Sequence, residues 1–107
     1  MSDVTLTEIE NLTHFNEFID KETLTVVDFY TTWCGPCHAF APTFQALANE
    51  YTDANFIKVD IEKAEDVGEK YEITSIPTIM LFRKGEMIEK VKNRGMLGEE
   101  IKAQLAA

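Results

Sequence analysis

The sequence Trp33-Cys34-Gly35-Pro36-Cys37 holds both cysteines of the chain, two residues apart. On a helix this spacing brings the two sulfur atoms within one turn of each other, which suits a disulfide. Zinc sites use the same spacing, so the pattern alone fits either disulfide chemistry or metal binding. In a reducing compartment a close cysteine pair is more often catalytic or metal-binding than structural.

The position of the pair favours redox chemistry. Residues 24–30 form a nearly continuous apolar run, typical of a buried strand, and residues 36–51 show helical spacing. Pro36 suits the first turn of that helix. Cys34 therefore lies at a helix N-terminus, where unpaired N–H groups and the helix dipole stabilise a thiolate, the nucleophilic form. Cys37, one turn further on, is expected to be more buried and to keep its proton longer.

The rest of the chain predicts the elements that position this pair. We expect further strands at residues 4–9, 56–61, 78–82 and 87–91, and helices after Asn11 or Thr13, from Pro36, near Ala64 and near Leu97. Pro42 lies inside the second helix and is expected to kink it. The order β-α-β-α-β-α-β-β-α predicts an α/β fold: a largely parallel sheet, helices on both faces, and a closing antiparallel hairpin.

Length and composition predict one soluble domain, residues 1–107, with 45% apolar and 27% charged residues. Ten Lys and Arg against 19 Asp and Glu give a formal charge of -9, which argues against nucleic-acid binding. No segment approaches the roughly 18 apolar residues that a membrane span needs. The first residues also lack the pattern of a secretory signal, so we expect a cytoplasmic protein with no membrane contact.

The sequence closely resembles the thioredoxin family. The resemblance covers nearly the whole chain in the right order and includes residues 27–37, Pro42, Lys58-Val59-Asp60, Ile76-Pro77-Thr78 and Gly85. In the family these positions are the active-site strand and helix start, the helix-kinking proline, the third strand, the cis-proline loop and the hairpin glycine. The resemblance implies the thioredoxin fold, a central mixed five-stranded sheet flanked by four helices.

The resemblance also implies a protein-disulfide reductase and electron carrier that works by reversible dithiol–disulfide exchange. Cys34 is expected to attack a client disulfide, and Cys37 to resolve the mixed disulfide, which leaves the pair oxidised. The family implies recycling by a thioredoxin reductase, a flavoprotein, with electrons from NADPH, and no cofactor on this chain. Implied clients are disulfide-containing proteins such as peroxiredoxins or reductases, and the protein is expected to be a monomer.

Asp28 interrupts the apolar run of its strand. Burial of a lone carboxylate raises its pKa, and a raised pKa suits a group that takes a proton from Cys37. The family assigns this role to the matching aspartate, acting through a water, and pairs that aspartate with the lysine that matches Lys58. The alternatives are an Asp28 bonded to backbone amides and a Lys58 that is merely solvated on an edge strand.

The Ile76-Pro77 bond is expected to be cis on the resemblance alone, since only about 5–6% of X–Pro bonds in folded proteins are cis. In the family this loop packs beside the cysteines and offers backbone groups to the client chain. Trp33, Ile76 and Pro77 are therefore expected to bind clients, together with Gly35 and Pro36. The last two, lying between the cysteines, are also expected to tune the redox potential. For Trp33 the alternative is a packed core aromatic.

Three residues near the cysteines depart from the family pattern. His38 stands where lysine is most frequent, and its titration near neutral pH would alter the local field. The alternative is a solvent-facing residue that couples only weakly to the site. Thr31 and Thr32 replace residues that are often alanine or acidic in the family.

The segment Lys92-Asn93-Arg94-Gly95 is a further departure. It lies where the family has a glycine facing the active site, and Gly95 comes about two positions late. Either Asn93 fills the place of that glycine or the loop carries a small insertion. Lys92 and Arg94 are expected to make this rim of the client groove basic on an otherwise acidic protein.

Three rival functions fit parts of the sequence less well. A zinc site would have only Cys34, Cys37, His14 and His38 as ligands, and their spacing is not that of a zinc module. A disulfide oxidase or isomerase would keep the fold, but isomerases usually have Gly-His between the cysteines rather than Gly-Pro. A purely binding module would not need both cysteines, although a second, non-catalytic role is compatible with them.

Overall fold

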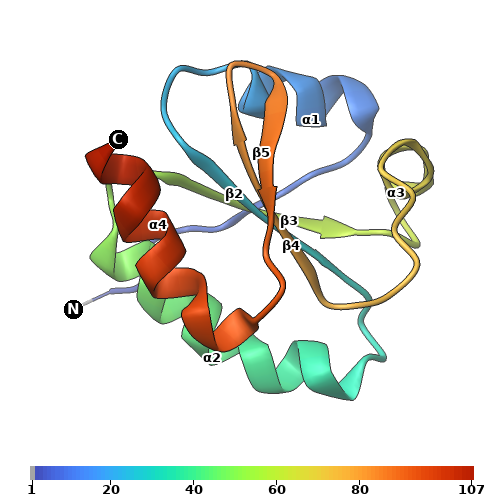
Figure 1. Ribbon diagram of the computed structural model, residues 1–107. Coiled ribbons are helices and arrows are strands. Elements are labelled where there is room, and N and C mark those ends of the chain that lie inside the picture. The colour runs from blue at the N-terminus through green and yellow to red at the C-terminus, as the bar shows by residue number, and fades with distance from the viewer. Residues whose placement is uncertain (1) are drawn as a thin grey trace.

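The computed structural model describes residues 2–107, which form a five-stranded mixed sheet with helices on both faces (Figure 1). The elements follow the order predicted from the sequence, with one short 3-10 helix added near the C-terminus. In chain order they are β1 (Thr7–Glu8), α1 (Leu12–Ile19), β2 (Thr25–Tyr30), α2 (Gly35–Glu50), β3 (Asn55–Asp60), α3 (Glu65–Lys70), β4 (Thr78–Arg83), β5 (Glu86–Lys90), η1 (Arg94–Met96) and α4 (Leu97–Ala106).

The strand order β1-β3-β2-β4-β5 places β2 at the centre of the sheet. Since β2 and β3 run parallel, the segments that follow Tyr30 and Asp60 leave the sheet at the same edge. Thr78 is the antiparallel partner of Phe29, so β4 begins, just after Pro77, at this edge as well. The sheet therefore brings three loops together: those that follow β2 and β3, and the one that precedes β4.

Alternate residues of the strands face two separate apolar clusters. One cluster is built on α1 and α3 and includes Val27 of β2. The other is built on α2 and α4 and includes Val26 of β2 and Phe56 of β3. Side chains two residues apart on a strand share a face. Asp28 and Lys58 therefore point toward the α2 face, and their Cα atoms are register partners.

The first strand is shorter than the predicted residues 4–9 and consists of Thr7 and Glu8 only. The backbone of Val4 bonds to side chains of α2 instead of to a neighbouring strand. Its N–H donates to Asn49 Oδ1 at 2.9 Å, and its carbonyl accepts from Gln45 Nε2 at 2.9 Å. These contacts were not visible in the alternating pattern that predicted a longer strand.

The other predicted elements agree with the structure to within about one residue at each end. Asn11 caps α1 by accepting a hydrogen bond from the His14 N–H at 2.9 Å, one of the two caps that the sequence suggested. The β4–β5 turn falls at Lys84 and Gly85, which have φ values of 55° and 82°. Across residues 2–107, the structure has no helix that is both long and apolar enough to span a bilayer.

Candidate active site

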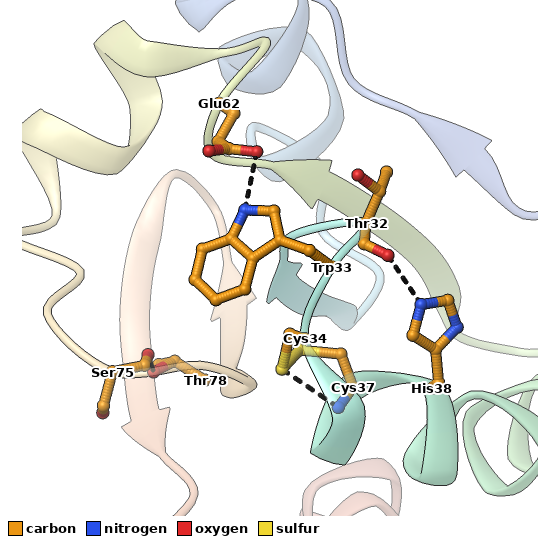
Figure 2. Close-up of a disulfide and its surroundings, with 8 residues drawn as sticks. All are labelled: Thr32, Trp33, Cys34, Cys37, His38, Glu62, Ser75 and Thr78. Carbon is orange, nitrogen blue, oxygen red and sulfur yellow. Dashed lines mark hydrogen bonds between the residues drawn. A yellow bond between two sulfur atoms is a disulfide. The ribbon is translucent and has the colours of Figure 1, made fainter.

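Cys34 and Cys37 form a disulfide at the start of α2, at the sheet edge where the three loops meet (Figure 2). Their Cα atoms are 5.2 Å apart. Cys34 is the N-cap residue of the helix, and its sulfur accepts a hydrogen bond from the Cys37 N–H at 3.1 Å. The proline that follows, Pro36, occupies the first turn, as predicted. An N–H donated to sulfur at a helix N-terminus favours the thiolate over the thiol.

The expectation that Cys37 lies deeper than Cys34 is wrong for this disulfide form. Each cysteine has 5% of its surface exposed. The Cys34 sulfur turns back over the first helical turn, toward the Cys37 N–H, and is tied there by the disulfide. The residues directly before and between the cysteines, Trp33, Gly35 and Pro36, are exposed, so a client can reach them.

Asp28 is a buried carboxyl beside this pair, with 2% of its surface exposed. Within the described residues its Oδ1 has no hydrogen-bond partner, which argues against the alternative of a carboxylate held by backbone amides. Burial raises its pKa from 3.8 to about 6, against the opposing effect of the Lys58 ammonium. A carboxyl with a pKa near 6 can both take and give a proton near neutral pH.

A cavity of about 100 Å³ lies between Asp28 and Cys37. Its lining includes both Asp28 and Cys37, together with Tyr30, Thr31, Thr32, His38, Ala41 and Lys58. Asp28 and Cys37 thus line one small cavity that is partly open to solvent. A cavity of this size can hold water, and a water there would have polar partners on several sides.

Lys58 is held beside this cavity by neighbours that the sequence did not indicate. Its ammonium lies 4.3 Å from the centroid of the Tyr30 ring, a cation–π contact. The Tyr30 hydroxyl donates to Glu8 Oε1 at 2.6 Å, and burial raises the pKa of Tyr30. Because β3 lies between β1 and β2, Lys58 is not on an edge strand, which excludes that alternative.

Trp33 is an exposed aromatic rather than a core residue, with 69% of its surface accessible. Its Nε1 donates a hydrogen bond to Glu62 Oε1 (Figure 2), and the two atoms are 2.9 Å apart. Glu62 in turn has its N–H bound to Asp60 Oδ1 at 2.9 Å. Sequence reasoning missed Glu62. The signal was available, since Glu62 follows β3 at the edge where Trp33 follows the parallel strand β2.

The loop before β4 has the predicted cis bond between Ile76 and Pro77. Pro77 is buried and Ile76 is half-buried. Thr78 Oγ1 donates to the Ser75 carbonyl at 2.5 Å and closes the loop on itself. The backbone before Pro77 therefore lies at the same sheet edge as the disulfide.

The residues that depart from the family pattern have well-defined positions and contacts in the structure. His38 is exposed, and its Nε2 lies 2.6 Å from the Thr32 carbonyl oxygen. Thr31 is buried with 2% exposed and lines the cavity with Asp28. Asn93 is the N-cap of η1 and accepts a hydrogen bond from the Gly95 N–H at 2.9 Å.

The four residues of the rival zinc site are not assembled. His14 lies on α1, whose cluster is on the other face of the sheet from α2, and its Nδ1 accepts from the Glu10 N–H at 3.1 Å. Residues 2–107 contain no group of three or more His, Cys, Asp and Glu side chains placed to hold a metal ion.

Comparison with known proteins agrees with this geometry. The family model described as Thioredoxin matches residues 6–107. Thioredoxin-1 of Schizosaccharomyces pombe is 37% identical over 100 residues, covering 92% of this chain and 97% of that protein. Thioredoxin-1 of Saccharomyces cerevisiae is 38% identical over 86 residues, or 80% of this chain and 84% of that one.

Solved structures are similar over the same length. The thioredoxin of Trypanosoma brucei brucei superposes with a TM-score of 0.91 at 26% identity, covering 96% of this chain and 93% of that one. A yeast structure has a TM-score of 0.86 at 35% identity, covering 92% of this chain and 95% of that one. It concerns the thiol-resolving mechanism of mitochondrial 1-Cys peroxiredoxin via glutathione and thioredoxin systems.

Proposed function

The chain belongs to the thioredoxin family of thiol–disulfide oxidoreductases, and we propose that its 107 residues form one domain in which Cys34 is the nucleophile and Cys37 the resolving thiol. One observation carries the assignment: the Cys34 sulfur caps α2 and accepts the Cys37 N–H. That position stabilises negative charge on Cys34, whereas Cys37 lies one turn inside the helix.

The exchange proceeds in two substitutions at sulfur. Cys34 thiolate attacks one sulfur of a client disulfide, so that a mixed disulfide forms and the other client sulfur leaves as a thiolate. Cys37, once deprotonated, attacks the Cys34 sulfur and releases the second client thiolate. Two electrons pass to the client, which gains two thiols, and Cys34 and Cys37 end as the disulfide seen here.

Asp28 serves as the proton acceptor for Cys37 in the second substitution. The two side chains line one cavity, and the raised pKa of Asp28, about 6, fits a base that works near neutral pH. Lys58 shares that cavity and opposes the rise in the Asp28 pKa. We assign Lys58 to holding the Asp28 pKa near neutrality, so that the carboxylate is available as a base.

We assign client binding to Trp33, Ile76 and Pro77. Trp33 presents an exposed indole beside the disulfide, and the Ile76-Pro77 segment ends at the same sheet edge. Gly35 and Pro36, in the first helical turn, tune the redox potential through the stability of the Cys34 thiolate.

A flavoprotein thioredoxin reductase, supplied with NADPH, is proposed to restore the dithiol. Peroxiredoxins are proposed clients, because one structural neighbour concerns resolution of a peroxiredoxin thiol via the thioredoxin system. We place the protein in the cytoplasm and regard it as a monomer. The family also includes the mitochondrial Thioredoxin-3 of Saccharomyces cerevisiae, so fractionation of cells is the test of this location.

Insulin reduction tests the proposed function. We expect the purified protein to accelerate reduction of the insulin disulfides with NADPH and a thioredoxin reductase. A parallel assay with dithiothreitol as the electron donor removes the dependence on a matched reductase. No acceleration in either assay would contradict a role in dithiol–disulfide exchange.

Replacing Cys37 with serine is expected to stop the reaction after the first substitution. The serine hydroxyl cannot attack the Cys34 sulfur, so clients remain bound as mixed disulfides. Non-reducing electrophoresis should show adducts that dithiothreitol releases. The single variant Cys34→Ser, which keeps Cys37, is the matched control, and equal trapping by that variant would overturn the assignment of Cys34.

A further inference from the structure

Three positive side chains gather in one short stretch of an acidic protein. Lys90, Lys92 and Arg94 are three of the ten Lys and Arg residues, and residues 90–94 contain no acid. The rest of the chain has seven cations against 19 acids. We call these three residues the basic rim.

Strand alternation places Lys90 and Lys92 on the same side of the backbone. Val91 is buried, and its N–H donates to the Ile79 carbonyl at 2.9 Å, which extends the pairing of β5 with β4 by one residue. Lys90 and Lys92, on either side of Val91, therefore point away from the core. Both are exposed, as is Arg94.

The basic rim lines a groove beside the cis-proline loop. This groove has a volume of about 360 Å³, and its lining consists of the basic rim, Val91, Ser75, Pro77 and Thr78. None of these lining residues is acidic. An extended segment that passes the Ile76-Pro77 bond would therefore meet three cations on one side and a neutral loop on the other.

Arg94 extends the positive charge toward the cysteines. Its guanidinium carbon lies 6.0 Å from the centroid of the Phe40 ring, and Phe40 is one turn beyond Cys37 on α2. The opposite flank of the site carries the carboxylate of Glu62, bound to Trp33. The two flanks of the disulfide thus have opposite charge.

We propose that the basic rim makes this protein select client segments in which acidic residues flank the reactive cysteine. The proposal rests on the proposed function and adds the chemistry of the substrate to it. Opposite charges across a contact steer the encounter, and exposed ion pairs lose strength as salt screens them. Each exposed ion pair contributes up to about a fivefold change in rate.

Matched disulfide peptides test this selectivity. Three homodimeric peptides would carry one cysteine flanked by Glu, Gln or Lys and otherwise be identical. For each peptide, the rate at which the pre-reduced protein reduces its disulfide is divided by the rate at which dithiothreitol reduces it. This ratio corrects for the effect of the flanking residues on the reactivity of the peptide disulfide itself. At low salt we expect the corrected rate to be about tenfold higher for the Glu than for the Gln peptide, and lowest for the Lys peptide.

Two double variants test whether the basic rim causes the preference for the Glu peptide. In Lys92→Gln/Arg94→Gln the ratio of the Glu to the Gln rate should fall toward one. In Lys84→Gln/Lys102→Gln, at the β4–β5 turn and on α4, the net charge changes equally and the ratio should stay at the wild-type value (Figure 1). Rising salt should reduce the wild-type ratio.

The results of these experiments distinguish a failure of the selectivity proposal from a failure of the proposed function. Equal corrected rates for the Glu and Gln peptides in the wild type, or an unchanged ratio in the rim variant, would overturn the selectivity proposal while leaving disulfide reduction intact. Failure to reduce any of the three peptides would contradict the proposed function and this proposal together.

Discussion

Replacing Cys34 with serine is expected to lower the rate of insulin reduction by at least about a thousandfold, to the rate without protein. The helix N-terminus stabilises a thiolate at this position, but a serine hydroxyl there stays protonated and is a poor nucleophile toward sulfur. The loss should appear equally with NADPH and reductase or with dithiothreitol as the electron source.

The Cys34→Ser protein should remain folded, because removal of one sulfur atom leaves both apolar clusters intact. Its circular dichroism and unfolding midpoint are to be compared with those of the reduced wild type, which also lacks the disulfide. Substantial insulin reduction by folded Cys34→Ser would show that another group makes the first attack.

Replacing Asp28 with asparagine is expected to change how stability depends on pH. The folded-state pKa is about 6, raised by burial from an ordinary 3.8. A raised pKa means that the folded state binds the proton more tightly than the unfolded chain. The resulting stabilisation is complete below about pH 4 and is lost as pH rises through about 6. At about 1.4 kcal/mol per pKa unit, the loss is about 3 kcal/mol.

Asparagine has nearly the same shape and no ionisation in this range. The free energy of unfolding of Asp28→Asn minus that of the wild type should therefore rise by about 3 kcal/mol between pH 3.5 and pH 7.5. Urea unfolding of the wild type and of Asp28→Asn, each with the Cys34–Cys37 disulfide formed, measures this difference. The exposed Asp53→Asn is the control and should show no such rise. A constant difference for Asp28→Asn would mean that Asp28 ionises normally.

The same variant should slow the second substitution. Without a base at position 28, Cys37 must lose its proton to solvent, and we expect turnover to fall by at least about tenfold near pH 7. The formation of the mixed disulfide by Cys34 should be affected less. Single-turnover kinetics with a disulfide peptide separate these two steps, and an unchanged second step would remove Asp28 from the mechanism.

The sequence predicted the sheet because its strands are unusually clear. Residues 24–30 form an apolar run broken only by Asp28, and buried parallel strands favour such runs. Helical spacing and cap residues predicted that α1 begins after Asn11 or Thr13 and that α2 begins near Pro36, and the structure has these starts at Leu12 and Gly35. Local signals of this kind act within a few residues, and they predicted the bounds of β2, α2, β3, β4 and β5 to about one residue, whereas the start of β1 was wrong by three residues.

Contacts between segments far apart in the chain could not be predicted from such local signals. Glu8 binds the Tyr30 hydroxyl, and the Tyr30 ring holds the ammonium of Lys58, although three different strands supply these residues. Each side chain alone resembles any other surface residue. The short β1 has a similar origin, because Val4 bonds to side chains of α2 that are more than 40 residues away.

The burial of the cysteines illustrates a third limit. Position on the helix predicts that Cys37 lies deeper than Cys34, but in the disulfide form the two residues are equally buried, each with 5% of its surface exposed. The sequence predicts the pair and its place at the start of α2, but not how much of each cysteine is exposed.

The most direct measurement mixes the fully reduced protein with one equivalent of a disulfide peptide, with no reductase and no other thiol present. Mass spectrometry and a thiol count then follow both partners. Transfer of two electrons predicts two new thiols per peptide disulfide, and a protein that is lighter by two hydrogen atoms, with Cys34 bonded to Cys37. Recovery of both partners unchanged, with both cysteines still reduced, would contradict the account.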